Sequence, residues 1–148
     1  MNSFSLNLIS LVLYIQITNK KRNNMEKLHI EATKYTPEID LDHSGVLSMV
    51  GKSYPENTFE FYESTMQWTR EYFETSAASV TTVNLEITYF NSSSSKLFFD
   101  FFDLLDEVSS SHTIKINWIF DEENESAEEA GEDFIEDFED LDIKLVQK

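Results

Sequence analysis

The chain has 148 residues, enough for one domain with a substantial core, and its formal net charge is −17. Such a charge disfavours nucleic acid and anionic membranes as partners, because binding to phosphate groups requires a basic patch. The absence of cysteine excludes disulfides, thiolate metal sites and cysteine nucleophiles, and it agrees with a cytoplasmic location. Phenylalanine is abundant, so the acidity does not indicate disorder.

Residues 1–24 differ in character from the rest of the chain. An apolar run, residues 4–17, precedes three basic residues, and no acidic residue is present. The run is short for a membrane span, and the basic residues follow it, whereas those of a signal peptide come first. We therefore expect a non-native extension or a disordered, apolar tail, with Met25 as the natural start. A short amphipathic or anchoring segment is the alternative.

Two strands are predicted next. Residues 28–32 alternate apolar and polar side chains, as a half-buried strand does, and residues 46–50 form a second strand that Gly51 closes. Between them, Thr36 and a proline break the pattern, and residues 40–45 (DLDHSG) have the composition of a turn. The two strands are therefore predicted to be antiparallel neighbours.

A helix is predicted after residues 53–57 (SYPEN). Either Ser53 with Glu56, or Asn57 with Glu60, has the spacing of a capping box. The proline of this turn is tolerated only at or before the first helical turn. Aromatic and apolar side chains then recur at helical spacing, which predicts a wide face packed on a sheet.

The central stretch combines a strand, a polar junction and a second helix. Residues 80–90 alternate as a strand, and residues 93–109 are apolar over more than half of a helical circumference. Four serines separate Asn91 from Lys96. Unpaired amides and the positive end of a helix dipole meet at such a junction and favour a phosphate. We therefore expect a phosphate-accepting serine here; the alternative is a polar helix start with spare capping hydroxyls.

The C-terminal part begins with a fourth strand, residues 114–120. Residues 121–142 contain thirteen acidic residues and no basic one. Small and apolar residues recur within them at helical spacing, and Ser126 with Glu129 has capping-box spacing, which predicts a third, acidic-faced helix before a last strand at 141–146. The carboxylates lack the glycine and spacing of a calcium loop, so no metal site is predicted.

The predicted order, β-β-α-β-α-β-α-β, describes a single α/β domain with a mixed, mainly parallel sheet and an antiparallel first strand. Loops that follow parallel strands meet at one edge, so the SYPEN turn and the serine junction are expected to share a surface. The sequence has no nucleophile elbow, metal-spaced histidine pair or glycine-rich phosphate loop. We therefore expect neither an enzyme nor a bound cofactor.

From Met25 onward the chain resembles the SiaC family of bacterial regulatory phosphoproteins. The matching stretches are residues 36–40 (TPEID), 45–57 (GVLSMVGKSYPEN), 89–96 (YFNSSSSK) and 121–134 (DEENESAEEAGEDF). The resemblance implies a STAS-like fold, as in anti-sigma-factor antagonists. It also implies phosphorylation of the hydroxyl directly after Asn91, which is Ser92, with Ser93 as the reserve acceptor.

The partners that the resemblance implies are a serine/threonine switch kinase, a metal-dependent phosphatase and, in some bacteria, a diguanylate cyclase that makes cyclic di-GMP. The residues expected to contact partners surround the junction: Tyr54, Pro55, Glu56, Asn57, Asn91, Ser94 and Lys96. We thus expect a non-enzymatic signalling switch controlled by reversible serine phosphorylation. The alternatives are an acidic metal-binding protein or small enzyme that uses residues 121–133, and an unmodified interaction module.

Overall fold

The computed structural model describes residues 3–148, with side-chain environments for residues 7–17 and 25–148. Six strands form one sheet in the order β1-β2-β3-β4-β5-β6. The antiparallel strands are β1 (Leu28–Ile30), β2 (Glu38–Asp42) and β3 (Val46–Ser53). The strands β4 (Val80–Phe90), β5 (Thr113–Phe120) and β6 (Asp142–Gln147) continue the sheet in parallel with β3. This arrangement confirms the mixed, mainly parallel sheet that the sequence predicts.

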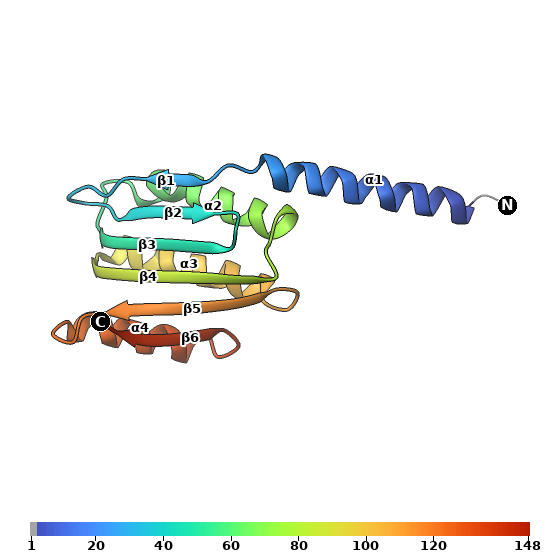
Figure 1. Cartoon of the computed structure of the whole chain (residues 1–148). Helices are drawn as coiled ribbons and strands as arrows, with labels where there is room; N and C mark the ends of the chain where they lie inside the picture. Colours follow the sequence, from blue (N-terminus) through green and yellow to red (C-terminus); the bar gives the residue numbers. More distant parts are fainter. Residues whose placement is uncertain (1–2) are drawn as a thin grey trace.

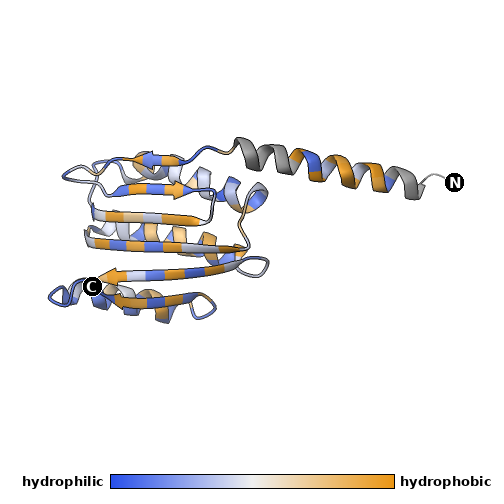
Figure 2. Cartoon of the chain, viewed as in Figure 1, coloured by the Kyte–Doolittle hydropathy of each residue, from blue (hydrophilic) through white to orange (hydrophobic). Residues whose placement is uncertain are grey.

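One helix lies in each crossover between parallel strands: α2 (Thr58–Thr75), α3 (Ser92–Val108) and α4 (Glu125–Asp137). All three pack on the same face of the sheet, and the other face is open (Figure 1). The strands alternate accordingly between apolar and polar residues (Figure 2). In β4, for example, Leu85 and Ile87 are buried, whereas Asn84 and Glu86 are partly exposed.

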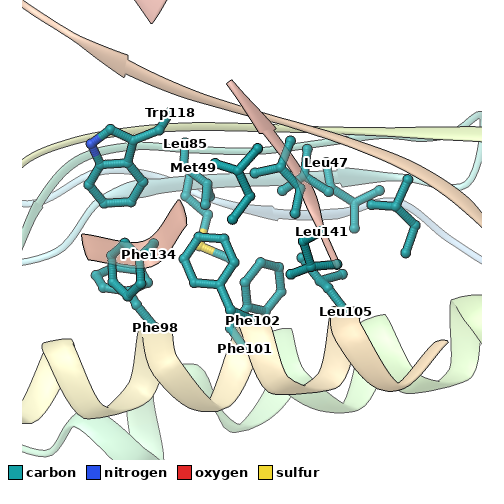
Figure 3. Packing of buried hydrophobic residues seen from close by; sticks show 14 of the residues in the cluster. Leu47, Met49, Leu85, Phe98, Phe101, Phe102, Leu105, Trp118, Phe134 and Leu141 are labelled. Atoms are coloured by element: carbon teal, nitrogen blue, oxygen red, sulfur yellow. The ribbon is translucent and has the colours of Figure 1, made fainter. Parts of the chain in front are cut away.

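The core lies between the sheet and the three helices (Figure 3). Its central residues are buried side chains of α3 and of the strands: Phe98, Phe101, Phe102 and Leu105, and Leu47, Met49, Leu85 and Trp118. Phe134 of α4 lies 4.5 Å from Phe102 and 5.3 Å from Trp118, measured between ring centroids. Burying one such side chain contributes roughly 1.5–3 kcal/mol to the free energy of unfolding. The four apolar side chains of α3 therefore fix the helix firmly on the sheet.

The strand β2 is missing from the sequence prediction. Residues 40–45 are predicted as a turn, but the turn is shorter and ends at Gly45, whose φ of 112° suits glycine. Ile39 and Leu41 are completely buried and point toward the core. The acidic residues that alternate with them, Glu38, Asp40 and Asp42, are unfavourable in strands and conceal the apolar pattern. As a result, β1 pairs with β2 and not with β3.

Three predicted boundaries also need correction. The strand β3 does not close at Gly51 but continues to Ser53, because a register shift at Gly51/Lys52 restores its pairing with β4. The helix α3 begins one residue earlier than predicted. The cap of α4 is Asn124 and not Ser126, since Asn124 Oδ1 accepts the Ala127 amide at 3.1 Å.

The helix α1 (Ser3–Asn24) occupies a segment to which the sequence analysis assigns no helix, and it extends away from the domain (Figure 1). Its described side chains, residues 7–17, are exposed although most are apolar. In the part of the chain that the structure describes, no helix has the length and apolarity needed to cross a membrane. The expectation that residues 1–24 are a non-native extension stays a prediction.

Candidate functional site

The SYPEN turn and the serine junction lie together at one end of the sheet, as the sequence predicts. The Asn91 amide donates a hydrogen bond to the Ser53 carbonyl at 3.1 Å, which joins the start of α3 to the end of β3. The Tyr54 ring packs edge-on against Tyr89 of β4, with the centroids 5.6 Å apart. We call the surface formed by Tyr54, Glu56, Asn57, Ser92, Ser93 and Lys96 the junction surface.

The first turn of α3 presents its positive end to solvent. Asn91 caps the helix: its side-chain oxygen accepts the Ser94 amide at 2.9 Å, and its carbonyl accepts the Ser95 amide at 2.9 Å. The amides of Ser92 and Ser93 come too early to find an acceptor within the helix. The side chains of both serines are exposed. A phosphate on either hydroxyl would therefore lie at the positive end of the helix dipole.

The four serines are not equivalent. Ser92, Ser93 and Ser95 are exposed, but Ser94 is completely buried. Ser94 lies one helical turn before Phe98 and on the same buried face. The expectation that Ser94 contacts a partner is therefore wrong, because its side chain lies beneath the surface. The apolar periodicity of α3, extended back by one turn, could have indicated this.

Ser94 belongs to a buried set of hydroxyls. Its Oγ lies 2.7 Å from Ser53 Oγ, which in turn lies 2.6 Å from the Tyr62 hydroxyl. Burial raises the pKa of Tyr62 to about 12, and the hydrogen bond with Ser53 opposes that rise. Tyr62 is therefore a neutral hydroxyl throughout the physiological pH range.

A groove begins at the junction surface and continues between α2 and α3. Its first part has a volume of about 450 Å³ and is lined by Glu56, Asn57, Thr58, Phe59, Ser93, Lys96, Leu97 and Asp100. A second part of about 400 Å³ shares Phe59, Leu97 and Asp100 and reaches Arg70. Phe59 is not among the site residues predicted from the sequence, although its side chain is 75% exposed. Phe59 lies beside the cap of α2 and outside the buried stripe of this helix, and this position could have predicted its exposure from the sequence.

Lys96 is the cation nearest along the chain to the exposed serines. Its Nζ lies 3.1 Å from Asp100 Oδ2, in an i,i+4 pair with both side chains exposed. Such pairs contribute only about 0.3–0.5 kcal/mol, so Lys96 can exchange Asp100 for a phosphate at little cost. Ser92 lies four residues before Lys96, which places the two side chains on one helical face.

Tyr54 of the junction surface belongs to a cluster of three tyrosines. Tyr54 is in contact with Tyr35 at 5.2 Å as well as with Tyr89. The side chains of Tyr35 and Tyr89 are 51% and 55% exposed. Exposed tyrosines held in fixed positions are typical anchors of protein interfaces. Tyr54 is among the residues predicted from the sequence, but Tyr35 and Tyr89 are not. Pairing of β3 with β4 brings Tyr89 close, and the Tyr54 amide donates a hydrogen bond to the carbonyl of Tyr35, in the loop between β1 and β2, at 2.8 Å.

The acidic C-terminal region offers no comparable site. Residues 121–123 are exposed, and α4 presents most of its carboxylates outward. Among the residues that the structure describes, no group of three or more histidines, aspartates and glutamates is placed to hold a metal ion. The metal-binding alternative therefore gains no support from the geometry.

Solved structures of a bacterial regulator have the same fold as this chain. The crystal structure of apo-SiaC from Pseudomonas aeruginosa matches with a TM-score of 0.70 and 29% identity, covering 84% of this chain and 99% of that one. A chain in the crystal structure of the diguanylate cyclase SiaD in complex with its activator SiaC, also from P. aeruginosa, matches with a TM-score of 0.75. That match has 32% identity and covers 82% of this chain and 99% of the other.

Sequence comparison leads to the same family. An uncharacterized protein of P. aeruginosa strain UCBPP-PA14 is 37% identical over 115 residues, which are 76% of this chain and 90% of the relative. The family model for SiaC family regulatory phosphoproteins matches residues 30–148, most of the chain and the whole of the sheet apart from the start of β1. The protein therefore belongs to the SiaC family of regulatory phosphoproteins, and it is a regulator and not an enzyme.

Proposed function

We propose that the protein is a cytoplasmic phosphorylation switch for a diguanylate cyclase. In the unphosphorylated form, the junction surface docks the cyclase and activates it. A serine/threonine switch kinase phosphorylates Ser92, with Ser93 as the reserve acceptor, and a metal-dependent phosphatase reverses the reaction. The observation that carries the proposal is the exposed Ser92 hydroxyl at the first position of α3, beside the SYPEN turn.

The chemistry of the junction suits reversible modification. A phosphate adds about −1.5 to −2 charges, and the N-terminus of a helix stabilises it by about 0.3–1 kcal/mol. Glu56 and Asp100, which line the groove together with Ser93, already make this surface acidic. A phosphate would add charge and a hydration shell that a docking partner must displace. Phosphorylation therefore opposes docking.

The comparisons support the choice of effector. In the solved complex, the SiaC of P. aeruginosa is the activator of the diguanylate cyclase SiaD. Its chain has the same fold as this protein over nearly its whole length. A coupling of about 1–3 kcal/mol between phosphorylation and docking would change affinity by roughly 5- to 150-fold, which is enough for a switch.

The test compares Ser92→Ala and Ser92→Asp with the wild type in binding to the cyclase of the same bacterium. We expect Ser92→Ala to bind but not to be released by the kinase, and Ser92→Asp to bind at least about fivefold more weakly. Phosphopeptide mapping should place the phosphate on Ser92 or Ser93. Phosphate found only outside residues 92–95 would rule out the proposal.

Ser126→Asp is the matched control. Ser126 is an exposed serine in the first turn of α4, after the Asn124 cap, so the substitution adds the same charge at a comparable helix start. We expect it to leave cyclase binding unchanged. Equal weakening by both aspartates would indicate a general charge effect, and no weakening by either would favour the unmodified interaction module.

A further inference from the structure

Three buried hydroxyl groups form a chain beneath the junction surface. Ser53 Oγ lies 2.7 Å from Ser94 Oγ and 2.6 Å from the Tyr62 hydroxyl, and all three residues are 0% exposed. Ser53 ends β3, Tyr62 lies in the first half of α2, and Ser94 lies in the first turn of α3. The hydroxyl chain therefore joins the three elements from which the junction surface is built.

The surroundings leave these groups little freedom. Tyr62 packs against Phe61 and Phe98 at centroid distances of 4.7 and 6.0 Å, so its ring determines where the hydroxyl points. A buried hydroxyl without a partner is costly, so each member of the chain holds the next in place. Ser53 also accepts the Asn91 amide through its carbonyl at 3.1 Å. Ser53 is therefore hydrogen-bonded to the start of α3 through both its backbone carbonyl and its side-chain hydroxyl.

We propose that Ser53 and Tyr62 are positioning residues for phosphate acceptance: they hold Ser94 in the core and thereby select Ser92 and Ser93 as the serines that a kinase meets. Successive residues of an α-helix are about 100° apart, so the burial of Ser94 sets the direction of every other hydroxyl in the run. The inference rests on the proposed function. It adds that the acceptor is chosen by a contact below the surface.

A second hydroxyl pair in the same domain provides a matched control. The Tyr72 hydroxyl lies 2.8 Å from Thr81 Oγ1 and accepts the Ala78 amide at 3.0 Å. Tyr72 and Thr81 are also 0% exposed. This pair joins α2 to the beginning of β4, whereas the serine junction follows the end of β4. Its loss should lower stability without disturbing the acceptor.

The experiment compares Ser53→Ala with Thr81→Val in the full chain. Each variant removes one buried hydroxyl that is hydrogen-bonded to the hydroxyl of a buried tyrosine. The first measurement is the amide exchange rate of Ser94 and Ser95, followed by NMR and corrected for the overall loss of stability. The second is the distribution of phosphate over residues 92–95, mapped by mass spectrometry in protein purified from its own bacterium.

We expect Ser53→Ala to raise the exchange rates at Ser94 and Ser95 at least tenfold and to move phosphate onto Ser94, and Thr81→Val to do neither. Tyr62→Phe and Tyr72→Phe form a second pair, in which each variant removes only the tyrosine hydroxyl, with the same expected contrast. If each pair changes exchange and phosphate distribution equally, or if neither measurement changes, the positioning role is excluded.

The two measurements separate this inference from the proposed function. The exchange experiment requires no kinase and reports only on how the first turn of α3 is held. Wild-type protein without phosphate at residues 92–95 would contradict the switch, even if exchange showed the expected contrast. Phosphate on Ser92 in the wild type and an unchanged pattern in Ser53→Ala would contradict only the positioning role.

Discussion

Asparagine caps all three helices that pack on the sheet. The side chains of Asn57, Asn91 and Asn124 each accept the amide three residues later, at 3.0, 2.9 and 3.1 Å. Two of these caps are followed by a hydroxyl residue, Thr58 and Ser92. The Thr58 hydroxyl is buried, whereas Ser92 is exposed. Exposure therefore distinguishes the candidate acceptor from a site with the same local sequence.

Tyr62 provides a residue-scale prediction about pH. Its pKa is raised from 10.0 to about 12, chiefly because burial disfavours the charged form. The stability that this shift reflects is fully present below pH 10 and is lost as the pH rises to about 12. The two-unit difference corresponds to about 3 kcal/mol of unfolding free energy.

The measurement is urea unfolding at several pH values between about 9 and 12, for the wild type and Tyr62→Phe. Lysine deprotonation affects both proteins, so the difference between their curves isolates Tyr62. We expect the wild type to lose more stability than the variant over this range. Parallel curves would show that the Tyr62 hydroxyl titrates normally and is not held in a buried environment.

At the scale of elements, α3 connects the core to the junction surface. The same buried face carries the phenylalanines that pack on the sheet and, one turn earlier, Ser94. The packing of these phenylalanines on the sheet therefore also determines which serines of the first turn face solvent. The helices α2 and α3 also form the groove that begins at Ser93, so the candidate acceptor lies at one end of a long interhelical surface.

The packing of α4 on the sheet gives an element-scale prediction. A Cβ atom added at Gly131 would lie 2.5 Å from both Leu145 Cδ2 and Trp118 Cδ1. Replacing glycine by alanine inside a helix normally stabilises the helix by about 1 kcal/mol, but overpacking of this kind costs about 1–3 kcal/mol. We therefore expect Gly131→Ala to destabilise the protein in urea unfolding. Ser126→Ala, at an exposed position of the same helix, should not destabilise the protein. If Gly131→Ala were more stable than the wild type, α4 would pack less closely on Trp118 and Leu145 than the structure indicates.

On the scale of the whole molecule, the domain and α1 have opposite characters. The domain has a closed core and a strongly acidic exterior, whereas α1 exposes Leu8, Leu11 and Ile15 along its described length. The family model begins at residue 30, within β1, and the core includes partly buried residues from Met25 onward. We therefore expect the folded domain to be stable without α1.

Removal of residues 1–24 tests this independence. The truncated protein keeps the hydrogen bond from Trp68 Nε1 to the Glu26 carbonyl, at 2.8 Å. We expect its melting temperature to agree with that of the full chain within about 2 °C, a change of well under 1 kcal/mol. A fall of more than about 5 °C would show that α1 contributes to the stability of the domain.

The sequence by itself determined the parallel part of the sheet, the helices of the crossovers, the common edge of SYPEN and the serine junction, and the family. These follow from local periodicity, capping residues and topology, which neighbouring residues encode. The structure alone decided which buried hydroxyl Ser94 meets, that β2 is a strand, and that Tyr35 lies beside the junction. Ser53 and Ser94 are 41 residues apart in the chain, and a contact at that separation has no local signature. Only the packing of α2 and α3 against β3 brings them together, and this contact decides which hydroxyls reach the surface.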